Sequence, residues 1–124
     1  MSDGYTILLK LEIIMKINEN DVINYLKDIS LKNELIQKAA QCCLEYVKNW
    51  KIDDPDEYKH WFGYVKEEEL SIEFKSHSFI FDNNHVDYVY IITTCEVFID
   101  PHFRAVNYNF VSRLDGEIID DYMT

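Results

Sequence analysis

The chain contains few of the residues that break or bend secondary structure. Its 124 residues include only three glycines and two prolines. This scarcity argues against long flexible linkers. The sequence also contains no glycine-rich phosphate loop, no GxSxG nucleophile motif, no internal repeat and no low-complexity segment. Because a length of 124 residues is typical of one domain, we predict a single domain over 1–124.

Cysteine is scarce too, and its number is odd: the three cysteines are Cys42, Cys43 and Cys95. A secreted disulfide framework normally uses an even number of cysteines. Adjacent residues of a helix point about 100° apart, so Cys42 and Cys43 are poorly placed to form a bridge with each other. We therefore expect reduced, apolar core cysteines and a cytoplasmic location.

The chain lacks a long apolar run without charges. Its most apolar stretch, Tyr5–Ile17, is too short for a membrane span and contains Lys10, Glu12 and Lys16. It also lacks the basic start and the small-residue cleavage site of a signal peptide. Apolar residues occupy alternate positions along it, which is typical of a strand with one buried face. We predict an N-terminal strand here and no association with a membrane.

Basic residues are far fewer than acidic ones. The chain has 12 lysines and arginines against 23 aspartates and glutamates, which gives a net charge of −11. Residues 63–124 alone hold twelve acidic and four basic residues, so this half carries most of the negative charge. Such a surface repels nucleic acid and anionic membranes, whereas a basic protein is its electrostatic complement. The alternative is that the charge serves only solubility.

Three helices are predicted ahead of the strands. The first covers roughly 19–29. Ser30 is expected to cap the second, Leu31–Trp50, whose apolar residues follow the three-and-four spacing of an amphipathic helix. Asp54 is expected to cap the third, with a proline at its first helical position and Gly63 at its end or as an interruption.

The remainder of the chain alternates between apolar and polar residues, as β-strands do. We predict a strand from Leu70 with a bulge or bend near 76–78. Further strands are predicted over 86–99, 103–114 and 117–123.

The order of these elements predicts the fold class. Helices and strands that are segregated along the chain are typical of an α+β fold. We predict an N-terminal strand and about three helices packed on one face of a C-terminal antiparallel meander of four to five strands. Asp115-Gly116 predicts a two-residue type I′ turn between the last two strands, with Arg113 within reach of Asp120.

Alternation also predicts which side chains face away from the helices. If Val89, Ile91 and Cys95 face the helices, the intervening residues form an outer surface rich in tyrosine and asparagine. Tyrosine supplies a large contact area at modest entropic cost, and nearby acids add electrostatic steering. The alternative is a half-exposed sheet, in which tyrosine is merely a good strand residue. The predicted partner-binding residues are Tyr88, Tyr90, Glu96, Asn107, Asn109, Asp120, Tyr122, Glu67, Glu68 and Glu69.

No catalytic or metal-binding pattern stands out. None of the four histidines has the spacing of a zinc ligand pair. His85 and His102 flank one long strand near aspartates, so a divalent metal or a His–Asp pair there is the alternative to solvated turn residues. Cys95 has no neighbouring cation to stabilise a thiolate. We expect no enzymatic activity, no cofactor and no metal.

The predicted function is that of a non-enzymatic protein that neutralises a basic partner, such as a toxin or nuclease. A bacterial toxin-immunity protein or a similar inhibitor is the concrete form, since the carboxylates can replace phosphates on the partner's basic surface. One alternative is a small-ligand-binding or enzymatic domain with an aromatic pocket, in an architecture similar to the nuclear-transport-factor-2-like folds. That alternative requires a cavity of about 300 Å³ or more. Another is a homodimer that packs two outer faces together.

Overall fold

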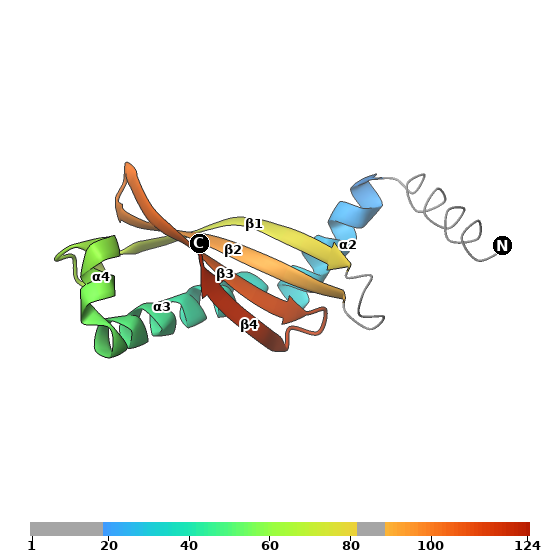
Figure 1. The fold of residues 1–124 in the computed structure, drawn as a ribbon. Coiled ribbons are helices and arrows are strands. Elements are labelled where there is room, and N and C mark those ends of the chain that lie inside the picture. Colours follow the sequence, from blue (N-terminus) through green and yellow to red (C-terminus); the bar gives the residue numbers. More distant parts are fainter. Residues whose placement is uncertain (1–18, 82–88) are drawn as a thin grey trace, which may run out of the picture. The chain divides into compact units, whose positions relative to one another are not determined.

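The computed structural model of the chain describes residues 19–81 and 89–124 (Figure 1). The predicted N-terminal strand and Tyr88 lie outside these residues. The chain divides into two compact units, which meet along the sequence between Lys32 and Asn33. Each unit is described by itself, and the single domain over 1–124 stays a prediction. Neither described part of the chain has a helix of the length and apolarity that crossing a membrane requires.

Helix α2 (Glu19–Lys32) is the described part of the first unit. Acidic residues in its first turn and Lys32 in its last turn match the polarity of the helix dipole. The predicted first helix is thus confirmed. The predicted helix start at Ser30 is wrong, because Ser30 lies inside α2. The break between helices is made instead by Glu34, whose φ of 51° is in the left-handed region.

The second unit begins with α3 (Leu35–Asp53) and α4 (Pro55–Phe62). The buried residues of α3 recur every four positions and so form one stripe, as the amphipathic pattern predicted. The α4 start is confirmed, since the Asp54 carboxylate accepts a hydrogen bond from the Glu57 N–H at 3.2 Å. Gly63, with φ +64°, ends α4. The stripe on α3 consists of Leu35, Ala39, Cys43 and Val47.

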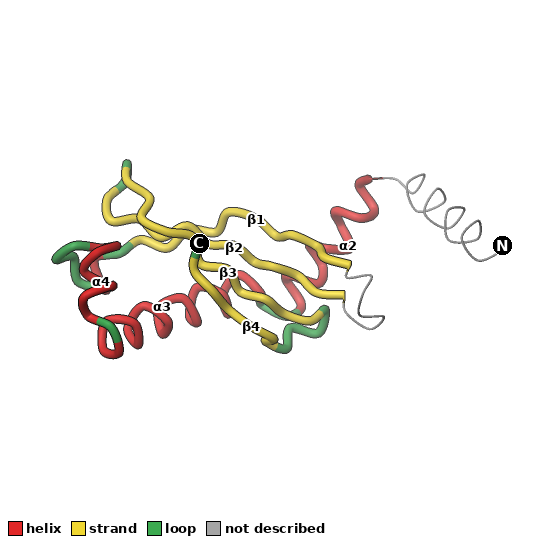
Figure 2. The backbone as a smooth tube through the Cα atoms, viewed as in Figure 1, coloured by secondary structure: helices red, strands yellow, loops and turns green. Residues whose placement is uncertain are grey.

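Four antiparallel strands follow in the order β1-β2-β3-β4, preceded by the short 3-10 helix η1 (Glu67–Glu69) (Figure 2). The helix-then-meander order confirms the α+β class. The bulge in β1 falls at Lys75, one residue before the predicted segment. The strands are β1 (Ser71–Phe81), β2 (Val89–Asp100), β3 (Phe103–Arg113) and β4 (Ile118–Met123).

The core lies between the sheet and the helices, where α3 packs on β1, β2 and β3 and α4 contacts α3 and β3. The Tyr46 ring of α3 meets the Tyr108 ring of β3 at 5.8 Å between centroids. Alternation along β2 and β3 places the predicted residues on this helix-facing side. The residues buried there are Ile91, Thr93, Cys95, Val97, Val106, Tyr108 and Phe110.

The turn between β3 and β4 differs from the predicted type I′ turn. That turn needs a positive φ at both central residues, but here only Gly116 has one, at +90°. The Gly116 N–H donates to the Arg113 carbonyl at 3.0 Å, and the Arg113 N–H donates to the Glu117 carbonyl at 2.9 Å. These bonds close a three-residue loop with a glycine bulge. The longer loop brings Arg113 to Glu117, 3.8 Å from Nε to Oε2, instead of to Asp120.

Gly116 is expected to be hard to replace. A Cβ on Gly116 would lie 2.9 Å from the Asn33 Cβ and 3.0 Å from the Lys38 Nζ, on a backbone that L side chains rarely adopt. Gly116→Ala should therefore lower the free energy of unfolding by about 1–3 kcal/mol in urea denaturation. Asp115→Ala is the control, because it removes only a carboxylate that accepts from the Glu117 N–H. Equal losses in the two variants would contradict this steric account.

Candidate protein-binding site

The sheet face turned away from α3 and α4, called the outer face below, carries most of the predicted partner-binding residues. The strand register places Glu96 beside Asn107 and Asn109 beside Tyr122. These side chains from three strands are therefore neighbours, although they are far apart in the sequence. Tyr88 lies outside the described residues. The predicted residues that the outer face brings together are Tyr90, Glu96, Asn107, Asn109, Asp120 and Tyr122.

Asn109 has a structural task on this face. Its Oδ1 accepts a hydrogen bond from the Thr94 hydroxyl at 2.9 Å. Its Nδ2 donates to the Thr124 hydroxyl at 3.0 Å and to the Tyr122 carbonyl at 3.4 Å. The residue is only 6% exposed. Asn109 therefore ties β2, β3 and the end of β4 together and offers little surface to a partner.

The acidic charge of the outer face is partly compensated. The Arg104 Nε lies 3.9 Å from the Glu96 carboxylate, and the Arg104 Nη1 donates to the Asn107 side chain at 3.0 Å. Glu73 stands directly opposite Glu96 on β1, so two carboxylates share that position. The outer face thus presents both charge signs together with Tyr90 and Tyr122.

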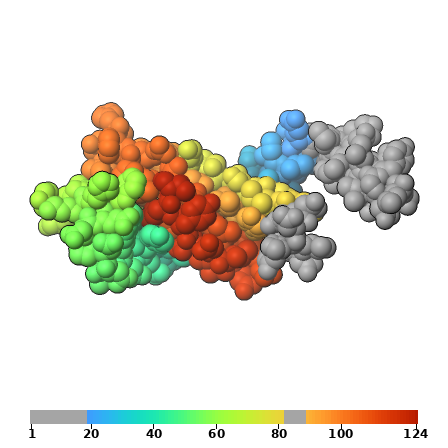
Figure 3. Space-filling view, in the orientation of Figure 1, coloured from blue at the N-terminus to red at the C-terminus, as the bar shows by residue number. Residues whose placement is uncertain are grey.

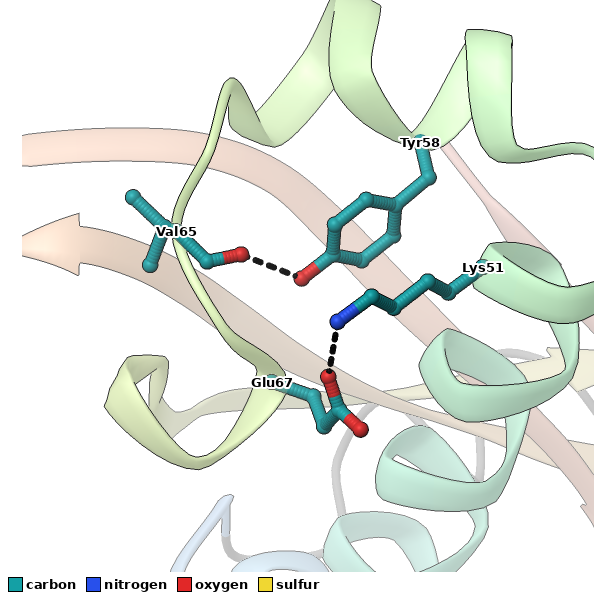
Figure 4. Close-up of polar contacts among 4 residues, drawn as sticks. All are labelled: Lys51, Tyr58, Val65 and Glu67. Carbon is teal, nitrogen blue, oxygen red and sulfur yellow. Dashed lines mark hydrogen bonds and ion pairs between the residues drawn. The ribbon is translucent and has the colours of Figure 1, made fainter.

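The predicted acids of η1 lie beside α3 rather than on the outer face. Lys51 donates a hydrogen bond from Nζ to the Glu67 carboxylate at 2.8 Å, next to Tyr58, whose hydroxyl donates to the Val65 carbonyl (Figure 4). The Lys51 hydrogen bond holds the pKa of Glu67 below its usual range. Glu67 is therefore engaged within the protein, and of the η1 acids Glu68 and Glu69 alone have no ion pair among the described residues.

A cleft between α3 and β4 is a site that the sequence reasoning missed. It has a volume of about 460 Å³ and is lined by residues of α3 and by Ile118 and Asp121 of β4. A second hollow of about 570 Å³ shares Tyr46 and Trp50 with it and extends to α4 and the end of β4. Figure 3 shows the red atoms of β4 directly beside the teal and green atoms of α3 and α4. We call both hollows together the α3–β4 cleft. Its lining residues are Cys42, Glu45, Tyr46, Asn49, Trp50, Asp53, Glu57, Trp61, Val106, Ile118, Asp121, Tyr122, Met123 and Thr124.

Packed aromatic rings form one wall of the cleft. The Trp50 ring makes edge contacts with Tyr46 at 6.1 Å and with Phe62 at 5.8 Å between centroids. Phe62 is buried, so its contact holds the Trp50 ring in place. Glu45, Asn49 and Asp53 follow at four-residue spacing along the same helix. In the sequence that spacing is indistinguishable from a solvated helix face, which is why it gave no signal.

The lining of the cleft is acidic. The Tyr108 hydroxyl donates to the Asp121 carboxylate at 2.7 Å and holds it in place. Burial, and then this hydrogen bond, raise the pKa of Tyr108 far above its usual range. Burial also raises the pKa of Tyr46, with further contributions from Asp121, Asp120 and Glu57. Carboxylates that disfavour a phenolate in this way favour a cation. The described residues that line the cleft include no lysine, arginine or histidine.

The remaining groups considered for catalysis or metal binding are the cysteines and the pair His85 and His102. Burial raises the pKa of Cys43 to about 12 and also raises the pKa of Cys95, so both thiols stay protonated at neutral pH. Residues 19–81 and 89–124 contain no group of three or more His, Cys, Asp or Glu side chains that could hold a metal ion. His85, part of the alternative metal site, lies outside them. His102 lies in a turn where its N–H bonds the Asp100 carboxylate.

Comparisons with known proteins give no match, whether the chain is compared with family models, with curated proteins or with solved structures.

Proposed function

We propose that the protein is a non-enzymatic binding protein that neutralises a basic partner protein. The observation that carries this proposal is the excess of uncompensated carboxylates. The chain has a net charge of −11. Within the described part of the chain, ion pairs engage only Glu67, Glu96 and Glu117, and all three pairs are solvent-accessible. A basic partner would supply the missing positive charge and would be attracted over long range.

The concrete form that we propose is an immunity protein or inhibitor against a basic bacterial toxin or nuclease, acting in the cytoplasm. Carboxylates spaced over a rigid sheet can occupy the phosphate-binding positions of such an enzyme. Tyr90 and Tyr122 on the outer face and the rings of the α3–β4 cleft supply contact area, as aromatic residues do in interfaces.

A second candidate function is binding of a small cationic ligand. The observation that favours it is the volume of the α3–β4 cleft, since 460 Å³ is within the usual range for ligand sites. A thermal-shift screen of small amines and guanidines separates the two functions, because a ligand that stabilises the protein in the absence of any protein partner supports the second.

The proposed function is tested by capture from the native host at low and high salt. The tagged wild-type chain is compared with Glu96→Lys/Asp120→Lys, which reverses two outer-face charges. Glu34→Lys/Asp56→Lys is the control, because it makes the same change in net charge at the residue that precedes α3 and in the first turn of α4. We expect a basic protein that the wild type and the control retain at low salt. The outer-face variant should retain at least about tenfold less of it.

Capture of one protein equally by all three chains, at all salt concentrations, would contradict the role of the charges. Light scattering of the purified chain tests the alternative that the protein is a homodimer. A stable dimer whose interface is lost in the outer-face variant would show that the outer face serves self-association instead.

A further inference from the structure

We propose that the α3–β4 cleft binds an extended segment of the partner, and that this segment contains lysine or arginine. This inference rests on the proposed function. This segment adds to the free edge of β4 as a fifth strand. The inference names the part of the basic partner that is recognised and the groups that recognise it. It combines three independent features of the cleft: a strand edge, a negative lining and an aromatic wall.

The strand edge follows from the hydrogen bonding of β4. Among the described strands, β4 stands at one end of the sheet order. Asn107 and Thr124 exchange both backbone hydrogen bonds at 2.9 Å. In an antiparallel pair such positions alternate with positions whose backbone groups point away from the partner strand. The backbone groups of Met123, opposite Tyr108, and of Asp121, opposite Phe110, point away from β3 in this way. Their N–H and C=O groups therefore point toward the edge of the sheet. The Asp121 N–H donates to the Asp120 carboxylate at 2.8 Å, so the backbone groups offered to a further strand are the Asp121 carbonyl and the N–H and C=O of Met123.

The same two residues line the cleft. A strand that pairs with β4 would place every second side chain on the cleft side of the sheet. Ile118 and Ile119, at 49% and 42% exposure, offer apolar surface at the start of β4. A segment in which cationic and apolar residues alternate fits this edge, and pairing to an exposed edge is a common mode of peptide recognition.

The acidic lining of the cleft selects basic residues on the side of the bound segment that faces it. The described lining holds four carboxylates and no basic group, and Asp121 is held toward the cleft by Tyr108. Rings from Tyr46, Trp50 and Trp61 are available for cation–π contact. A nucleic acid or an acidic peptide would be repelled. A second copy of this chain is also disfavoured, because Asp120 and Asp121 would meet their own equivalents along the edge. The four carboxylates belong to Glu45, Asp53, Glu57 and Asp121.

The test uses a synthetic peptide of about eight residues in which lysine and valine alternate, a usual strand length. The full chain is titrated with this peptide and followed by amide NMR and hydrogen exchange. We expect the amides of Asp121 and Met123 to shift and the amide of Met123 to exchange at least about tenfold more slowly, since a strand bond protects it. Glu45→Lys/Asp53→Lys should weaken binding at least about tenfold. Glu34→Lys/Asp56→Lys is the matched control and should bind within about threefold of wild type.

Three results would overturn the proposal. A glutamate–valine peptide that bound as well would exclude charge recognition. Unchanged binding by Glu45→Lys/Asp53→Lys would exclude the cleft, and unchanged amide exchange in the presence of bound peptide would exclude strand addition. If the charge-reversed variant does not fold, Glu45→Gln/Asp53→Asn repeats the test without introducing positive charge.

Binding of the intact partner to the charge-reversed variants distinguishes failure of this inference from failure of the proposed function. Loss of the captured partner in the outer-face variant but not in Glu45→Lys/Asp53→Lys would refute the cleft and leave the proposed function standing. An affinity for the partner that changes neither with salt nor with any of the charge reversals would refute the proposed function itself.

Discussion

Phe62→Ala is expected to lower the free energy of unfolding by about 3–5 kcal/mol, the usual cost of removing a buried phenylalanine ring. Phe62 is 1% exposed and contacts Trp50 at 5.8 Å and Tyr58 at 4.9 Å between ring centroids. It therefore joins α4 to α3. Because Trp50 forms part of the cleft wall, the variant should also bind the lysine–valine peptide more weakly where it is still folded.

Urea denaturation measures this loss against two controls. Trp61→Ala removes the neighbouring, larger ring, but Trp61 is 41% exposed and should cost clearly less. Phe62→Leu keeps most of the buried volume and should cost about 1–1.5 kcal/mol. A loss below about 1 kcal/mol for Phe62→Ala would show that α4 does not contribute to the core as described.

Asn109→Asp is expected to lower the free energy of unfolding by about 2–4 kcal/mol at neutral pH. The new carboxylate cannot donate to the Tyr122 carbonyl or to the Thr124 hydroxyl, and burial of its charge is unfavourable. Burial should raise the pKa of this carboxyl in the folded state above its value of about 3.9 in the unfolded state. The folded state then binds more protons, so the destabilisation should be largest at pH 7 and should shrink as the pH falls toward 4.

Asn107→Asp is the matched control for that experiment. Asn107 lies two residues away on the same face of β3, is only partly buried and accepts its hydrogen bond from Arg104. An aspartate can accept the same bond, so the stability should change by less than about 0.5 kcal/mol. Equal losses at both positions would show that Asn109 is not the internal tie that the hydrogen bonds indicate.

Much of this fold could be predicted because its strands are half-buried. A period of two places one face of β2 and β3 in the core, so Ile91, Cys95, Tyr108 and Phe110 could be assigned from alternation alone. The α4 start could also be predicted, because Asp54 and the following proline are a strong local signal.

The two wrong predictions, the helix start at Ser30 and the type I′ turn, lie where the backbone conformation of one residue determines the local structure. Glu34 separates two helices by adopting a left-handed φ that glutamate rarely takes, while Ser30 has the chemistry of a cap but lies inside α2. The Asp115-Gly116 pair suits a two-residue turn, yet Gly116 packs against Asn33 and closes a longer loop. At Gly116 a contact between residues distant in the sequence overrides the local preference.

The candidate site could be predicted only in part, for a similar reason. The outer face follows from alternation within single strands. The α3–β4 cleft depends on α3 packing over β1, β2 and β3 and leaving β4 beside it, which no local pattern reveals. Its acids therefore resemble a solvated helix face in the sequence. The compensation of Glu96 by Arg104 likewise depends on the register of β2 and β3.

The central claim is that the excess of carboxylates over basic residues recognises a basic protein, and the salt dependence of affinity tests it most directly. The purified chain and its captured partner are titrated by calorimetry from about 50 to 500 mM salt, a range over which the Debye length falls from about 14 to 4 Å. We expect the affinity to fall at least about tenfold for wild type, with a shallower slope for Glu96→Lys/Asp120→Lys. An affinity that stays constant across this range, with the same slope in both chains, would contradict the claim.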